Sequence, residues 1–357
     1  MSETTMKGQV MSVLGPLAPD AIGITMMHEH LLSDLQGAFV EPQNHVPERN
    51  EAHQPIELSN LSWVLRNWAN NRDNLVLSDV DLAVEEVNLF RQFGGGTLVD
   101  ATSKGLGRKP KELRTISKRT GINVVMGCSY YPARFHPTNM NELTQDQIAA
   151  EIIRDITEGV DDTGIRAGII GEVGCSWPLH PNEIKVLRAS TTAQLETGAP
   201  ISIHPGLHVD SPFRILDVLS AAGANIERVI MGHIERTNFE NRQDLLRLAN
   251  TGCYLEYDWF GVVLPTFPYG PVSVPSDGAR IQEIGFLVSE GFRKKVLVSQ
   301  DICLKTRLTA YGGPGYAHIT RYVQEWMREM NFDAEVIDDL LINNPAEILT
   351  FVQLMQQ

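Results

Sequence analysis

The stretch IGITMMHEH at residues 22–30 decides the fold, because it reads as a buried strand that ends in two histidines. A short, near-continuous apolar run is typical of a parallel strand that is covered on both faces. Residues two apart on a strand point the same way, so we expect His28 and His30 to share one face and Glu29 to point away. Paired imidazoles at a strand end suit a metal such as Zn²⁺, although this pair alone is weak evidence for a site.

Seven further runs of the same kind follow along the chain, each rich in β-branched residues. They are GGTLVDATS (95–103), INVVMGCSYY (122–131), AGIIGEVGCS (167–176), PISIHPG (200–206), ERVIMGH (227–233), CYLEYDW (253–259) and KKVLVSQD (294–301). Segments with helical spacing lie between them, and several end in glycine, which commonly caps the C-terminus of a helix. Alternation of strand and helix through eight strands predicts a parallel sheet.

Acidic or histidine side chains stand near the ends of four of these later runs. Glu172 lies in IIGEVG, His204 in PISIHPG, His233 in ERVIMGH and Asp301 in KKVLVSQD. Each would be a buried, unpaired polar group if nothing bound it, at a cost on the order of several kcal/mol. Chance placement of such residues at the ends of five strands is a poor explanation for the pattern. We therefore predict one site formed by His28, His30, Glu172, His204, His233 and Asp301.

The convergence of these residues also predicts the architecture. In an open doubly wound sheet, strands from both halves of the chain would not all meet at one point, whereas in a closed barrel their C-terminal ends do. We predict an α/β fold, a (β/α)8 TIM barrel, formed by residues 1–357 as a single domain. The polar, proline-containing residues 37–78 after the first strand are predicted to be a loop insertion, either a lid or pocket wall or a subunit contact.

Four imidazoles and two carboxylates suit two divalent cations, with one carboxylate bridging them. Two metal ions roughly 3.5–4 Å apart can share a water molecule and lower its pKa towards neutrality. Asp301 could then ligate one metal and act as the general base, because a carboxylate beside a dication stays ionised. Zn²⁺ is the first expectation for the metal, and Mn²⁺ or Co²⁺ accept the same ligands.

Composition argues against several other classes of protein. The formal charge of −14 and the lack of Lys and Arg runs disfavour a nucleic-acid or membrane-surface partner. No apolar run approaches eighteen residues, so no transmembrane helix is expected, and the N-terminus lacks the apolar stretch of a signal peptide. The four scattered cysteines contain no CxxC pair and read as free thiols, which favours the cytoplasm.

The order of these residues along the strands resembles the pattern of the amidohydrolase superfamily. That pattern has HxH on the first strand, an acidic or lysine ligand on the fourth, histidines on the fifth and sixth, and aspartate on the eighth. Within this superfamily, the chain is similar to the phosphotriesterase family, and most to its phosphotriesterase-related proteins, through GITMMHEHLL, AGIIGEVGCS, ISIHPG, VIMGHIERT, VLVSQDICLKTRL and NNPAEIL. The resemblance covers essentially the whole chain. It implies a homodimer with a buried metal held by the HxH pair and Asp301, bridged through Glu172 to a more exposed metal held by His204 and His233.

Two departures from the family pattern bear on the substrate. Phosphotriesterases proper carry a carbamylated lysine at the bridging position, where this sequence has Glu172, whose carboxylate supplies two oxygens without carbon dioxide. They also place a histidine at the end of strand seven, where YLEYDWFG offers Asp258 and Trp259. The proton-relay partner and the pocket shape therefore differ, which argues against phosphotriesters as the main substrate.

The loops after the strands set specificity in such a barrel. Candidate pocket residues are Tyr130, Tyr131, Trp177, Trp259, Lys305 and Arg307. In so acidic a protein, the last two suggest an anionic end on a small-molecule substrate, with a structural ion pair as the alternative.

The chain is therefore predicted to be a metal-dependent hydrolase that uses a metal-bridging hydroxide to cleave a small carbonyl substrate. An amide, such as an N-acyl amino or sulfonic acid, ranks slightly ahead of a carboxylic ester or lactone. A lactonase or aryl esterase with weak promiscuous phosphotriesterase activity is the alternative. A non-catalytic, metal-containing ligand-binding protein is the alternative of another class, and a metal-dependent isomerase or decarboxylase also stays open.

Overall fold

The computed structural model describes residues 6–43, 46–239, 241–262 and 274–352, and it confirms the predicted barrel. Eight parallel strands hydrogen-bond in the order β12-β11-β10-β9-β8-β7-β6-β3. They are β3 (Ile24–Glu29), β6 (Gly95–Asp100), β7 (Asn123–Cys128), β8 (Ile169–Gly174), β9 (Ile201–His204), β10 (Val229–Met231), β11 (Tyr254–Tyr257) and β12 (Val296–Val298). Each lies within one of the eight apolar runs of the sequence.

The barrel closes where the first strand meets the segment that follows the last one. Beyond β12, the amide of Asp301 donates to the carbonyl of His28 at 2.9 Å. Glu29 is buried and spans this seam: its carboxylate accepts the Ser299 hydroxyl at 2.8 Å and the Ile302 amide at 2.9 Å. A buried carboxylate surrounded by fixed donors holds the first strand in register with the end of the last.

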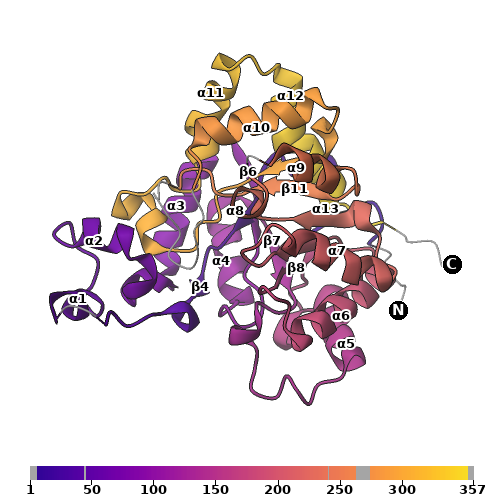
Figure 1. Ribbon diagram of the computed structural model, residues 1–357, viewed down its shortest axis with the longest axis horizontal. Coiled ribbons are helices and arrows are strands. Elements are labelled where there is room, and N and C mark those ends of the chain that lie inside the picture. The colour runs from indigo at the N-terminus through magenta and orange to yellow at the C-terminus, as the bar shows by residue number, and fades with distance from the viewer. Residues whose placement is uncertain (1–5, 44–45, 240, 263–273, 353–357) are drawn as a thin grey trace.

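Helices cover the outside of the barrel (Figure 1). The helices of the described chain, including the two of the insertion, are α1 (Val46–Glu51), α2 (Leu61–Arg66), α3 (Val80–Gln92), α4 (Pro110–Thr120), α5 (Gln145–Thr157), α6 (Pro181–Thr197), α7 (Ser211–Ala221), α8 (Ile234–Thr237), α9 (Arg242–Ala249), α10 (Asp277–Ser289), α11 (Gln324–Glu329), α12 (Ala334–Asp338) and α13 (Asn344–Leu349). The predicted glycine cap is present on α6, where Gly198 has a φ of +73°. Among the described residues, no helix has the length and apolar character needed to cross a bilayer.

The barrel interior has an apolar floor beneath the polar strand ends. Seven strands each contribute one residue to a buried cluster: Met27, Val99, Val125, Ile169, Ile230, Tyr254 and Leu297. Their chain neighbours, such as Val229 and Met231 beside Ile230, belong to the larger cluster that packs against the helices. Because successive strand residues point to opposite faces, the smaller cluster lies inside the barrel. Two short strands, β1 (Val10–Ser12) and β2 (Gly15–Leu17), form a hairpin whose Val10 joins it.

The predicted insertion, residues 37–78, carries α1 and α2 and extends to one side of the barrel (Figure 1); residues 44 and 45 lie outside the described part of the chain. Two short strands near the two ends of the insertion pair antiparallel, β4 (Ser33–Asp34) with β5 (Val76–Leu77). The side-chain oxygen of Asn74 accepts hydrogen bonds from the amide and the hydroxyl of Thr306, at 3.0 and 2.9 Å. The insertion is thus anchored to the segment after β12, close to the strand ends.

Candidate metal centre

The closed barrel brings together the six polar residues predicted at the strand ends: His28, His30, Glu172, His204, His233 and Asp301. They come from the C-terminal ends of β3, β8, β9, β10 and β12. None of their side chains is more than 14% exposed. The group is therefore largely shielded from bulk water by the described part of the chain.

Glu172 occupies the middle of this group. Its Oε1 lies 3.3 Å from Nε2 of His30, while its Oε2 lies 2.8 Å from Nδ1 of His204 and 3.4 Å from Nε2 of His28. Nε2 of His233 lies 2.9 Å from the same nitrogen of His204. The two carboxylate oxygens face different ligand atoms, which is the arrangement that a bridging carboxylate needs.

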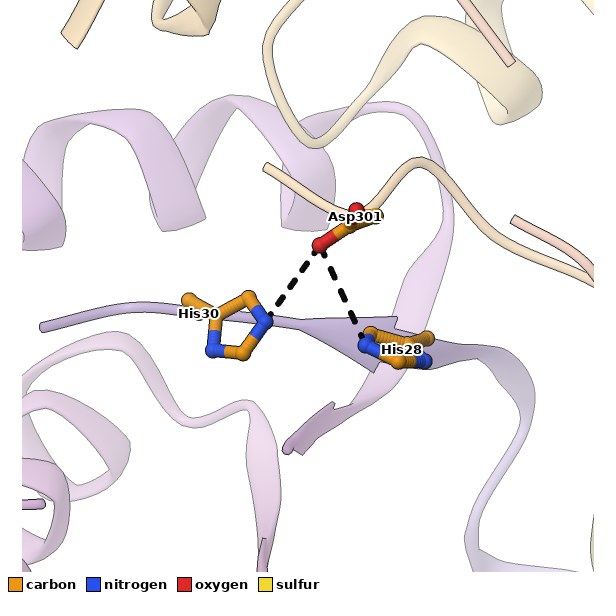
Figure 2. A group of neighbouring side chains, drawn as sticks. All are labelled: His28, His30 and Asp301. Atoms are coloured by element: carbon orange, nitrogen blue, oxygen red, sulfur yellow. Dashed lines mark ion pairs between the residues drawn. The ribbon is translucent and has the colours of Figure 1, made fainter. Parts of the chain in front are cut away.

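Asp301 faces the HxH pair from across the seam. Its Oδ1 lies 3.3 Å from Nε2 of His30 and 3.8 Å from Nε2 of His28, and Figure 2 shows the carboxylate aimed at both rings. One ligand atom from each of these three residues falls within 4.8 Å of the others. Ligand atoms of one tetrahedral zinc ion lie about 3.3 Å apart, so the spacing fits a divalent metal.

The ring nitrogens of His28 support the same interpretation. Neither makes a hydrogen bond among the described residues, although the side chain is completely buried and carboxylate oxygens of Glu172 and Glu256 lie 3.4 and 3.5 Å away. Buried polar atoms are normally satisfied, and an unsatisfied one calls for a ligand or ion. The surrounding imidazoles and carboxylates are the donors that zinc and similar metals prefer, so the residues fit a metal centre.

Both carboxylates of the group favour their ionised form. Burial alone would raise the pKa of Asp301, but the hydrogen bond with His30 and the charge of His28 bring this pKa below its ordinary value. Burial likewise opposes ionisation of Glu172, yet His28 and His204 hold its pKa well below the ordinary value. Positive charge between the two carboxylates stabilises their ionised form, and a bound cation would do the same.

Two of the six residues have a backbone conformation that is rare outside glycine. His233, directly after β10, has a φ of +54°, and Asp301, shortly after β12, has a φ of +49°. Such residues cost about 1–3 kcal/mol each and concentrate at functional sites. The structure thus maintains backbone strain at two positions that carry candidate ligands.

Two carboxylates, one in β11 and one directly after it, support the histidines from the barrel interior. Asp258 accepts Nδ1–H of His233 at 2.7 Å and the backbone amide of the same residue at 2.9 Å. Glu256, which is fully buried, lies 3.5 Å from Nδ1 of His28. Carboxylates in this position fix the orientation and tautomer of a ligand histidine. The sequence carried a signal for Glu256, which interrupts the apolar run YLEYDW two residues before Asp258.

Trp259 holds Asp301 from the cavity side. Its indole Nε1 donates to Oδ2 of Asp301 at 3.0 Å, whereas Oδ1 faces His30. The two carboxylate oxygens therefore have different partners. The backbone amide of Trp259 donates to Glu235 at 2.9 Å, and Glu235 lies 3.3 Å from Nε of the buried Arg280. A rigid support beneath the tryptophan therefore sets the orientation of the candidate base.

A cavity of about 570 Å³ opens onto the group and is lined by both His204 and Asp301. Four pocket residues predicted from the sequence line it: Tyr131, Trp177, Trp259 and Arg307. The insertion contributes Ala38 and Trp68, so this segment forms part of the pocket wall. The volume suits a small-molecule ligand.

Two other predicted pocket residues do not line this cavity. Tyr130 is buried, and its hydroxyl donates to Glu151 at 3.0 Å. Lys305 lies 2.5 Å from Asp73 of the insertion, so the ion pair left open by the sequence is present. A charge pattern in the sequence does not reveal which carboxylate a lysine will meet, because the partner lies 232 positions away.

Arg307 lines the cavity, but its guanidinium points into the protein backbone. It donates to the carbonyls of Asp301 at 2.6 Å and Phe260 at 3.3 Å, and also to that of Gln300. These bonds tie the loop after β12 to the loop after β11. The guanidinium therefore stabilises the cavity wall and is largely engaged before any substrate arrives.

Comparison with known proteins identifies the relatives of this barrel. The model of the phosphotriesterase family matches residues 8–349. N-acetyltaurine hydrolase from Xenopus tropicalis is 38% identical over 350 residues, which cover 98% of this chain and 99% of that protein. N-acetyltaurine hydrolase from Homo sapiens is 38% identical over 352 residues, with the same coverage.

Solved structures agree with these relatives. A resiniferatoxin-binding protein from Rhodobacter sphaeroides has a TM-score of 0.92 at 35% identity, covering 96% of this chain and 95% of that one. A lactonase from Listeria monocytogenes has a TM-score of 0.76 at 26% identity, covering 96% and 99%. The family model, the relatives and the shared fold all confirm the resemblance seen in the sequence. The chain belongs to the phosphotriesterase family and is a metal-dependent hydrolase.

Proposed function

We propose that this enzyme hydrolyses small N-acylated amino or sulfonic acids, using two divalent metal ions held by His28, His30, Glu172, His204, His233 and Asp301. The position of Glu172 carries the proposal, because its two oxygens lie 3.3 Å from His30 and 2.8 Å from His204. His28, His30 and Asp301 would hold one ion, His204 and His233 would hold the other, and Glu172 would offer one oxygen to each. Zn²⁺ is the metal that we expect first, ahead of Mn²⁺ and Co²⁺.

When bound, the two ions would polarise the substrate carbonyl and lower the pKa of a shared water molecule. Asp301 lines the cavity and its pKa lies below the ordinary value, so its carboxylate is placed to take up the proton of the attacking water. Protonated Asp301 then returns the proton to the leaving nitrogen. Tyr131 faces the same space, with its hydroxyl 3.3 Å from Nδ1 of His204.

The preference for an amide rests on the relatives. N-acetyltaurine hydrolases match nearly the whole chain at 38% identity, whereas the lactonase from Listeria monocytogenes matches at 26%. A lactonase or aryl esterase with weak phosphotriesterase activity is the second candidate, favoured by that lactonase. The homodimer and the cytoplasmic location expected from the sequence also stay part of the proposal, and the four unpaired cysteines suit a reducing compartment.

A substrate panel tests the proposed function. The values of kcat/KM would be compared for N-acyl amino acids, N-acetyltaurine, lactones, aryl esters and paraoxon. We expect the highest values on the N-acylated acids. Higher values on the lactones would favour the second candidate, and the highest value on paraoxon would contradict the interpretation of Trp259. Binding without turnover of any member would favour a ligand-binding protein.

Elemental analysis of protein purified without chelators tests the metal centre. We expect close to two divalent ions per chain. Their removal should lower the midpoint of thermal unfolding, because an ion at about 1,000 times its dissociation constant stabilises the folded state by about 4 kcal/mol. Readdition of Zn²⁺, Mn²⁺ or Co²⁺ should restore the midpoint and the activity. Full activity in protein that contains no metal would contradict the proposal.

Substitution of Trp259 by Phe should lower kcat/KM roughly 10- to 100-fold. The change removes the N–H that holds Oδ2 of Asp301 and keeps an aromatic ring in the cavity wall. Metal content and thermal midpoint should stay near those of the wild type. Trp177→Phe, on the exposed rim of the same cavity, is the matched control and should leave kcat/KM almost unchanged. Equal losses in the two variants would contradict the positioning role.

A further inference from the structure

Arg236 is a buried cation at the edge of the candidate metal centre. It lies in α8, three residues after His233, and lines the cavity. Its side chain is 9% exposed, and its Nη2 donates to the carbonyl of Pro205 at 2.6 Å. Its Nε is buried without a hydrogen-bond partner in the part of the chain that the structure describes. A guanidinium has five N–H donors, so donors remain for a ligand.

The carboxylates of Asp258, Asp301 and Glu172 act on the charge of Arg236 through space, and in the loaded centre they would face the metal ions. Within the described ranges, no carboxylate lies at ion-pair distance from its guanidinium. The guanidinium carbon lies 5.8 Å from the ring centroid of Trp259, and Pro205 follows the candidate ligand His204. A buried cation beside a centre that binds cations costs on the order of several kcal/mol, unless an anion joins it. The arrangement thus leaves room for one negative charge supplied from outside.

We propose that Arg236 binds the acid group of the substrate, a sulfonate or carboxylate, and so selects anionic amides over neutral ones. The inference rests on the proposed function and assigns its specificity to a residue that sequence reasoning did not single out. Arginine suits this task because its planar fork donates two parallel hydrogen bonds to one acid group.

The other basic residues near the cavity are less well placed. Lys305 pairs with Asp73, and Arg307 donates to backbone carbonyls. Arg134 also lines the cavity, but its side chain is exposed and lies over the ring of Phe135, with the guanidinium carbon 5.0 Å from the ring centroid. Arg236, by contrast, is buried. Its guanidinium donates to the carbonyl of Pro205, the residue after the candidate ligand His204.

Two matched substrates test the selection. One is N-acetyltaurine, and the other is its neutral methyl sulfone, which has nearly the same shape. We expect Arg236→Met to lower kcat/KM on N-acetyltaurine about 100-fold and to leave kcat/KM on the sulfone nearly unchanged. Arg188→Met is the control and should change neither value by much, because Arg188 is exposed on α6 and does not line the cavity. Should Arg236→Met fail to fold, Arg236→Gln, which can still donate to Pro205, carries the same expectation.

Binding of propane-1-sulfonate, measured by calorimetry on the metal-loaded protein, separates this inference from the proposed function. The wild type should bind this anion and Arg236→Met should not. Equal losses on both substrates, or unchanged sulfonate binding in the variant, would overturn the assignment of Arg236. Sulfonate binding that depends on Arg236, without hydrolysis of either amide, would support the anion site and overturn the proposed function.

Discussion

Asp301→Asn is expected to lower kcat about 1,000-fold while part of the metal stays bound. Asparagine has nearly the same shape as aspartate and can still offer an oxygen to a metal, but it cannot accept the proton of the attacking water. The indole of Trp259 competes for this single oxygen at the position of Oδ2, so part of the metal should be lost. Loss of turnover should therefore exceed loss of metal.

The measurement pairs single-turnover kinetics with elemental analysis of the same sample. Asp210→Asn serves as the control, because this carboxylate is 61% exposed and belongs to the loop after β9. It should match the wild type in both readouts. Activity within about tenfold of the wild type in Asp301→Asn would show that another group accepts the proton.

Arg280→Met should lower the free energy of unfolding by about 3–5 kcal/mol. The Arg280 side chain is fully buried, and its guanidinium lies 3.3 Å from Glu235 and 2.7 Å from Asp277. Methionine keeps much of the volume but leaves the buried Glu235 without its cation, and leaves Asp277 with His318 alone, at 2.7 Å. Because Glu235 accepts the backbone amide of Trp259, the substitution should also reduce kcat/KM.

Urea titration of the metal-loaded protein would measure this loss of stability. Arg328→Met is the matched control, since Arg328 is 51% exposed and pairs with Glu325 at 3.0 Å on one helix. An exposed pair of this kind contributes at most about 1 kcal/mol. A loss in Arg280→Met no larger than that in the control would show that the buried network is dispensable.

The sequence was sufficient to predict the barrel. Parallel strands covered on both faces need near-continuous apolar runs, so each strand leaves a local signal that needs no knowledge of its partner. Helix ends leave local signals as well, such as Gly198 after α6. The seam is different, because the partners of Glu29 lie about 270 positions away and nothing local marks them.

In the candidate site, too, residues with a local sequence signal could be predicted and residues defined by distant contacts could not. The six strand-end residues could be found because each interrupts an apolar run, and Glu256 could have been found by the same rule. Arg236 and Lys305 could not be separated, since both are basic residues shortly after a strand. Only the folded chain shows that Lys305 meets Asp73, whereas Arg236 lies against the carbonyl of Pro205 in the cavity wall.

The seam has a consequence for how the protein is made. His28 bonds to Ser299, which is 271 positions later, so the two sides of the seam leave the ribosome at different times. At about 5–20 residues per second, translation separates them by roughly 15–55 s. During that interval the nascent first strand has an open edge and its histidines lack Asp301. Metal loading should therefore follow translation of the last strand, and chaperones that cover open strand edges should bind the growing chain before then.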